Sequence, residues 1–111
     1  MSDFDELTQA ILEFRDNRQW EKYHTPKNLS MSIAIEAAEL MEIFQWQDQK
    51  HADFLINMGE KAIDYNNACD ELADILIYCL LFADTLAIDI EAAVITKLKK
   101  NENKYPMIRS R

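Results

Sequence analysis

Apolar residues recur every three to four positions along most of this chain, which is the period of an α-helix. In the first segment with this pattern, Phe4, Leu7, Ile11 and Phe14 fall on one helical face. The chain contains only one glycine and two prolines, so turns between strands would lack the residues that they need. We therefore expect an all-α fold whose long helices span residues 3–19, 28–45, 63–87 and 89–103.

Polar residues mark where these helices begin and end. Asp3, Asn28 and Asp89 each stand at the start of a periodic segment, where a side-chain oxygen can accept a hydrogen bond from the first turn. Pro26 disfavours a helical residue immediately before it, and Pro106 ends the last helix.

Two internal regions depart from the simple pattern. Residues 46–57 are mixed in character, with Asp48–His51 predicted as a loop and a short helix predicted around Gly59. Ile75–Phe82, in contrast, is apolar on every side. A helix of that kind lies at the centre of a bundle or in a subunit interface.

Length and charge limit the classes of function. The 111 residues suit a single domain over residues 1–111, which would bury about 65% of its unfolded surface, so oligomerisation is a plausible supplement. A net charge of −8 argues against general binding to nucleic acids or anionic membranes. No apolar run has membrane-spanning length, and the first residues do not form a signal peptide, so we expect a cytoplasmic protein.

The two cysteines do not suggest a disulfide. Cys69 and Cys79 fall in one predicted helix, where a separation of ten residues places them about 15 Å apart. A disulfide needs Cα atoms within about 7 Å, so an internal bridge is excluded if the helix forms.

The strongest chemical signal is a pair of acidic motifs within apolar surroundings. Glu36 and Glu39 are three residues apart, as are Glu71 and Asp74, so each pair lies on one helical face. Acidic side chains are rarely buried without a partner, and four converging carboxylates would repel one another. A hard divalent cation with oxygen ligands would remove that repulsion.

The alternative is coincidence, because helices are rich in glutamate, and spacing alone leaves both interpretations open. A di-iron site would need Glu-x-x-His motifs, and neither His24 nor His51 provides one within a predicted helix. With oxygen donors only, Mg²⁺ or Mn²⁺ suits the four positions better than zinc or iron.

The order of these motifs resembles the MazG-like, all-α nucleoside triphosphate pyrophosphohydrolases, and within them the dCTP pyrophosphatase branch. The resemblance covers roughly residues 12–106 and rests on several short segments besides the acidic pairs: Phe14–Leu29, Phe44-Gln45-Trp46, Lys97, Asn101 and Lys104-Tyr105-Pro106. Each segment is weak by itself, but their joint presence in this order is specific.

The resemblance implies a four-helix bundle completed by homo-oligomerisation, as a dimer or a tetramer. It implies Mg²⁺-dependent hydrolysis of deoxynucleoside triphosphates at the α–β phosphoanhydride, giving a monophosphate and pyrophosphate. Glu36, Glu39, Glu71 and Asp74 would hold the metal, and Glu39 would also act on the attacking water. Substrate-binding residues would be Trp20, His24, Trp46, Tyr78, Lys97, Asn101 and Lys104.

Aromatic residues in helices usually belong to the core, and a histidine in a loop often has no role. Trp20 and Trp46, however, lie at predicted helix ends, and Tyr78 lies one turn after Asp74. The resemblance assigns them to the base and sugar pocket, with Tyr78 against the ribose 2′ position.

Two departures from the family leave the substrate open. The segment between the acidic pairs is longer than is usual, and Ile11 replaces a histidine of the animal dCTP pyrophosphatases. Use of dCTP-like nucleotides, dATP or non-canonical nucleotides remains open. The alternatives are a pyrophosphohydrolase for dUTP or phosphoribosyl-ATP, and a non-catalytic helical interaction protein that retains the fold.

Overall fold

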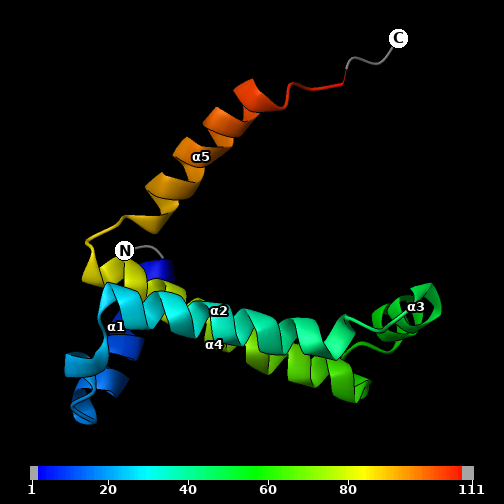
Figure 1. Cartoon of the computed structure of the whole chain (residues 1–111), viewed down its shortest axis with the longest axis horizontal. Helices are drawn as coiled ribbons and strands as arrows, with labels where there is room; N and C mark the ends of the chain where they lie inside the picture. Colours follow the sequence, from blue (N-terminus) through cyan, green and yellow to red (C-terminus); the bar gives the residue numbers. More distant parts are fainter. Residues whose placement is uncertain (1–2, 109–111) are drawn as a thin grey trace.

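The computed structural model describes residues 3–108, and this part of the chain consists only of helices and their connections, as predicted (Figure 1). Five α-helices and two short 3₁₀ helices follow one another: α1 (Asp3–Asn17), η1 (Glu21–Tyr23), α2 (Pro26–Phe44), α3 (Gln49–Met58), η2 (Gly59–Lys61), α4 (Ile63–Thr85) and α5 (Ile90–Lys104). None of the described helices is long and apolar enough to cross a membrane.

Helices α2 and α4 form the central pair of the molecule and lie side by side over most of their length (Figure 1). Helix α1 crosses this pair at one end and packs on α4, whereas α3 lies at the opposite end. The few buried apolar side chains belong mainly to α2 and α4: Leu29, Leu80, Leu81 and Ala83, together with Ala62 just before α4. The central pair therefore holds the small core of a single chain.

The apolar Ile75–Phe82 segment of α4 is only partly buried within one chain. Leu80 and Leu81 are enclosed, but Leu76 and Ile77 remain exposed. The segment thus has one face in the core and another face that this chain leaves open.

The start of α2 corrects one predicted cap. Thr25 has an extended backbone, and its Oγ1 accepts a hydrogen bond from the Asn28 backbone N–H at 3.1 Å. Pro26 is the first helical residue, a position where its missing N–H costs nothing. The prediction of Asn28 as the cap was wrong, because Asn28 is already in the first turn and its amide donates to the Tyr23 carbonyl oxygen.

Helix α1 differs from its prediction at both ends. Asp3 is the first helical residue and not the cap, and the position before it lies outside the described residues. At the other end, Gln19 has a positive φ of 56° and lies beyond the helix, which stops at Asn17.

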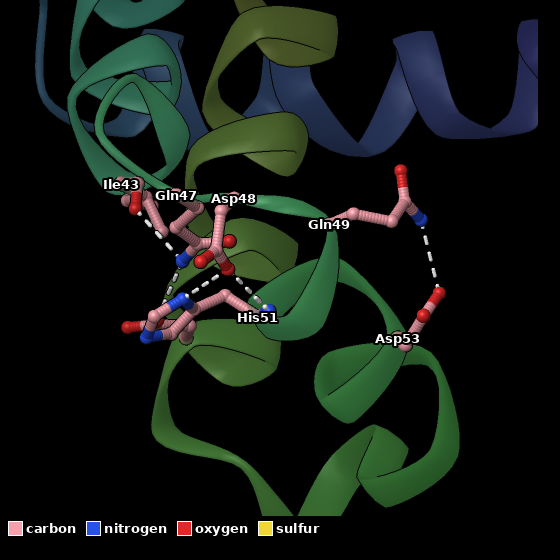
Figure 2. Close-up of polar contacts among 7 residues, drawn as sticks. Ile43, Gln47, Asp48, Gln49, His51 and Asp53 are labelled. Atoms are coloured by element: carbon pink, nitrogen blue, oxygen red, sulfur yellow. Dashed lines mark hydrogen bonds and ion pairs between the residues drawn. The ribbon is translucent and has the colours of Figure 1, made fainter.

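The segment after α2 also corrects a prediction, because Asp48–His51 is not a loop. Asp48 is the N-cap of α3, and its Oδ1 accepts hydrogen bonds from the backbone N–H and the Nδ1 of His51 at 3.0 and 2.7 Å (Figure 2). These contacts lower the pKa of Asp48, with the backbone N–H of His51 as the main cause. The short helix predicted around Gly59 is confirmed as η2.

A single glutamine connects the ends of the central helices. The Gln47 amide donates to the Ile43 carbonyl oxygen at 3.1 Å (Figure 2) and to the Asp64 carboxylate at 2.9 Å. Because Asp64 lies in the first turn of α4, this side chain joins the end of α2 to the beginning of α4.

Helix α4 ends at Thr85, two residues earlier than predicted, and Ala87 has a positive φ of 54°. The chain then enters α5, whose N-cap is Asp89 as predicted, with a 3.0 Å hydrogen bond to the Ala92 backbone N–H. Both cysteines lie in α4 and are free, which confirms that they form no bridge.

Helix α5 projects away from the rest of the molecule (Figure 1) and contains no buried residue. The described chain has a radius of gyration of 17.5 Å, whereas a compact domain of this length has one of about 13 Å. Its accessible surface is 9161 Å², compared with about 6,300 Å² expected for a compact monomer of this mass. The chain therefore leaves a large apolar area uncovered.

Candidate active site

Carboxylates from the two central helices converge. Glu36 on α2 and Glu71 and Asp74 on α4 each offer one oxygen, and these three atoms lie within 4.8 Å of one another. The packing of α2 on α4 brings the groups together, since Glu36 is separated from the other two by more than thirty residues of chain. Three of the four predicted metal ligands thus form one cluster.

The cluster is electrostatically strained. The pKa of Glu36 is raised to about 7, first by its hydrogen bond with Glu71, then by burial, and then by contact with Glu39 and the charges of both neighbours. Because Glu39 contributes to the pKa shift of Glu36, its carboxylate lies close to Glu36. Glu39 is nevertheless outside the group of three carboxylates that lie within 4.8 Å of one another.

Two oxygens in the cluster are buried without any hydrogen-bond partner among the described residues, one from Glu36 and one from Glu71. Buried oxygens normally have a donor, and several carboxylates at this separation are unfavourable unless a positive charge lies between them. The donors are all hard oxygens, which suit Mg²⁺ or Mn²⁺. The arrangement therefore fits a divalent metal ion.

Glu39 lies on the solvent side of the cluster. It is exposed and borders a shallow hollow of about 410 Å³ together with Glu71, Asn67 and Asp70. A carboxylate in this position reaches water and the cluster at the same time.

A cleft of about 710 Å³ opens between α1 and α4, beside the carboxylates. Its volume is in the range of small-molecule sites. Asp74 lies at the wall of this cleft, and so do three of the predicted substrate-binding residues, Trp20, His24 and Tyr78. The fold thus joins one predicted metal ligand and three predicted substrate contacts in a single cavity.

The turn after α1 holds Trp20 in place. Because Gln19 has a positive φ, the chain reverses and the Trp20 backbone N–H donates to the Arg15 carbonyl oxygen at 3.2 Å. The indole packs edge-on against the Phe14 ring, with centroids 5.9 Å apart. The Arg18 guanidinium covers the same ring at 3.4 Å from its centroid, so Trp20 belongs to a small rigid group of side chains.

His24 lines the same cleft, where its surroundings favour the neutral form of its ring. Its pKa is lowered, first by burial and then by the positive charge of Arg15. Its Nδ1 is buried and has no partner within the described chain. A neutral imidazole with an unpaired nitrogen is available to a ligand in the cleft.

Arg15 is a cleft residue that the sequence reasoning missed. Its side chain is only 11% exposed, it lines the cavity, and it pairs with Asp16 at 2.8 Å. The available signal was its position four residues after Ile11, which places a cation on the apolar face of α1.

The remaining predicted substrate residues line neither the cleft nor the hollow beside Glu39. Trp46 is 88% exposed just beyond the end of α2. Lys97, Asn101 and Lys104 all lie on the projecting helix α5 and line neither the cleft nor the hollow beside Glu39.

Comparison with known proteins agrees with this geometry. The model of the MazG-like family matches residues 31–111, and the chain belongs to that family. A crystal structure of a pyrophosphatase from Archaeoglobus fulgidus is 45% identical, with a TM-score of 0.83, and the match covers 96% of this chain and 95% of that one.

Curated relatives include dCTP pyrophosphatase 1 of Bos taurus and of Homo sapiens. The bovine protein is 33% identical over 108 residues, covering 96% of this chain and 62% of the relative. The human protein is 30% identical over 102 residues, covering 92% of this chain and 58% of the relative. The chain thus spans about three fifths of the length of these relatives.

Proposed function

We propose that the protein is a Mg²⁺-dependent pyrophosphohydrolase that cleaves deoxynucleoside triphosphates between the α and β phosphates, releasing a monophosphate and pyrophosphate. The observation that carries this proposal is the position of the carboxylate cluster at the edge of a nucleotide-sized cleft. The named activities of the relatives support the same reaction class.

Glu36, Glu71 and Asp74 would hold the metal, and Glu39 would complete its surroundings. A bound divalent ion neutralises phosphate charge and lowers the pKa of a water molecule. Glu39 is the carboxylate best placed to orient that water and accept its proton, because it contacts Glu36 and remains open to solvent.

The cleft would take the nucleoside. Trp20 offers an aromatic face that the turn at Gln19 holds in place, and Tyr78 lines the same cleft from α4. We assign Tyr78 to the ribose 2′ position, where its ring would exclude a hydroxyl. Replacing Tyr78 with alanine should then lower the preference for dNTP over NTP by roughly tenfold. An unchanged ratio of the two kcat/KM values would remove Tyr78 from sugar selection.

A second copy of the chain would complete the site. The uncovered apolar area and the isolated position of α5 support a homodimer or homotetramer, in which α5 of one copy reaches the cleft of another. Lys97, Asn101 and Lys104 would then contact the phosphates, and Trp46 would contact the nucleotide. Sedimentation as a monomer at micromolar concentration contradicts this part of the proposal.

Within this class, the physiological role would be the removal of unwanted dCTP-like nucleotides, dATP or non-canonical nucleotides. The decisive experiment is product analysis after incubation with Mg²⁺ and each dNTP and NTP in turn. Appearance of dNMP and pyrophosphate without dNDP supports the reaction. No turnover of any nucleotide in the panel, with dUTP and phosphoribosyl-ATP included, contradicts it.

A further inference from the structure

The carboxylate cluster lies between two ends of the central helix pair that are held together differently. At one end, Leu29 near the start of α2 and Leu80 and Leu81 near the end of α4 are buried. At the other end, where α2 stops and α4 begins, Ala62 is the only buried apolar residue of the described chain. Apolar packing therefore holds the two helices together mainly on one side of the cluster.

Gln47 provides a polar contact at the second end. Its amide donates to the Ile43 carbonyl oxygen in the last turn of α2 at 3.1 Å (Figure 2) and to the Asp64 carboxylate in the first turn of α4 at 2.9 Å. Outside the carboxylate cluster, no other side-chain hydrogen bond in the described part of the chain connects residues 26–47 with residues 63–85. This one side chain therefore joins the helices where apolar packing is weakest.

The contact lies about two helical turns from the cluster. Glu39 and Ile43 are four residues apart on α2, and Asp64 and Glu71 are seven residues apart on α4, which is about 10 Å along the helix. The hollow that Glu39 and Glu71 border is also lined by Ile43, whose carbonyl oxygen accepts the hydrogen bond from Gln47. The contact thus closes the same helical interface that carries the carboxylates.

The cluster itself acts to separate the two helices. Three oxygens, from Glu36, Glu71 and Asp74, lie within 4.8 Å of one another, and like charges at this distance repel when no cation is bound. Helices that moved apart would relieve the repulsion, and binding of a cation would then have to bring them back together. A contact that holds the helices in place reduces this rearrangement and so strengthens binding.

We propose that Gln47 is a positioning residue for the carboxylate cluster, and that its hydrogen bond to Asp64 keeps the carboxylates in the arrangement that binds a divalent cation. The inference rests on the metal site of the proposed function and adds a residue that touches neither the cation nor the nucleotide. It assigns Gln47 to cation affinity and not to the chemical step.

The first test measures Mn²⁺ binding without nucleotide, from the electron paramagnetic resonance signal of the unbound ion. Replacing Gln47 with leucine removes both hydrogen bonds without changing the charge, and should raise the dissociation constant for Mn²⁺ at least about threefold. An unchanged dissociation constant overturns the inference even if the Tm falls, because a purely structural role lowers stability alone.

Gln49 offers a matched control, since its amide also donates to an aspartate, Asp53, at 3.0 Å (Figure 2). Both residues belong to α3, so this hydrogen bond does not join the helices that carry the cluster. Replacing Gln49 with leucine should leave the dissociation constant for Mn²⁺ as in the wild type. An equal increase in the Gln47→Leu and Gln49→Leu proteins overturns the specific role of Gln47.

Two further comparisons separate positioning from the electrostatic field. Gln47→Glu places a second carboxylate against Asp64, and the resulting repulsion should weaken Mn²⁺ binding, whereas an added negative charge by itself would strengthen it. Stronger binding therefore overturns the inference. Asp64→Asn and Asp64→Leu remove the same charge, but only asparagine keeps an oxygen that accepts from Gln47. The asparagine protein should bind Mn²⁺ more tightly than the leucine protein, and equal affinities contradict the proposal.

Hydrolysis distinguishes this inference from the proposed reaction. The Gln47→Leu protein should need at least about threefold more Mg²⁺ for its half-maximal rate, with a maximal rate close to that of the wild type. A lower maximal rate with an unchanged Mg²⁺ requirement overturns the positioning role. If no triphosphate is hydrolysed but Gln47→Leu weakens Mn²⁺ binding, the reaction is wrong and the positioning role stands. Absence of Mn²⁺ binding to the wild type overturns the inference together with the metal site.

Discussion

Helices α4 and α5 follow one another in the chain, and both were expected to contribute to the active site, yet they differ sharply in their surroundings. Helix α4 packs along α2 and against α1, and it contributes two carboxylates to the cluster and one wall of the cleft. Helix α5 projects away, buries no residue and has Val94, Ile95 and Leu98 more than half exposed.

Within the described chain, the packed helices bring together the acidic residues of the proposed site, whereas the lysines of α5 lie apart from them. The carboxylates meet because α2 and α4 bury their apolar residues against each other within the chain. No residue of α5 is buried within the described chain. The position of its lysines relative to the carboxylates therefore depends on the surface against which α5 packs. A hydrophobic face that remains open on one chain is the physical reason to expect a second copy.

The largest expected effect concerns the acidic half. Replacing Glu39 with glutamine should leave the fold intact and lower kcat by at least about a hundredfold, since it removes the proposed general base beside the carboxylate cluster. Replacing Glu13 with glutamine is the control and should have little effect, because Glu13 is an exposed glutamate of α1 that lies outside the cluster and lines neither the cleft nor the hollow beside Glu39. An unchanged rate for Glu39→Gln removes Glu39 from the mechanism.

The next largest effect should come from α5. Replacing Leu98, which is 57% exposed, with aspartate puts a charge on the apolar face of this helix and should dissociate the assembly. Activity should fall at least about tenfold as phosphate contacts are lost. Sedimentation velocity measures the assembly, with Lys99→Asp as the control at the neighbouring position. If the Leu98→Asp protein retains its assembly and activity, α5 does not form the interface.

A smaller effect should appear in the pH dependence of stability. The pKa of Glu36 in the fold is about 7, above the value of about 4.5 for a free glutamate. The folded state therefore binds the proton of Glu36 more tightly than the unfolded state does. In the metal-free protein, the stabilisation that this proton gives should be complete below pH 4.5 and should be lost as the pH rises through 7.

Added Mg²⁺ should reverse this loss, because the metal binds the ionised carboxylates. The increase in Tm on adding Mg²⁺ should therefore be larger at about pH 8 than at about pH 5. The Glu36→Gln protein lacks this titrating group, so the Tm of its metal-free form should fall less between about pH 5 and about pH 8 than that of the wild type. A Mg²⁺ effect on Tm that is the same at both pH values contradicts the cluster as a metal site.

The smallest effect concerns the start of the packed helix α2. Replacing Thr25 with alanine removes the hydrogen bond to the Asn28 backbone N–H and should lower the free energy of unfolding by about 1 kcal/mol. The control is Ser30→Ala, because the Ser30 hydroxyl donates to a carbonyl oxygen of the same helix, and it should lower the free energy of unfolding by less. Urea denaturation measures both, and equal losses would show that Thr25 contributes nothing special as a cap.

Much of the fold was predictable because it depends on local rules. The helical period located α1, α2, α4 and α5, and Asp89 was correctly expected to cap α5. Helix α3 was missed because it has only 10 residues and because the Asp48 cap that starts it resembles an ordinary polar loop. The cap of α2 was placed at Asn28 and not at Thr25 because both residue types serve as caps, and only the backbone conformation shows which of them precedes the helix.

The sequence by itself determined that the chain is helical and that each acidic pair shares a helical face, because both depend on spacing within a helix. The meeting of Glu36 with Glu71 and Asp74, and the position of Arg15 beside His24, were decided only by the tertiary structure. Such contacts depend on which helices pack together and at what angle. The pattern of apolar residues along the chain shows which face of each helix is buried, but it specifies neither the partner helix nor the packing angle.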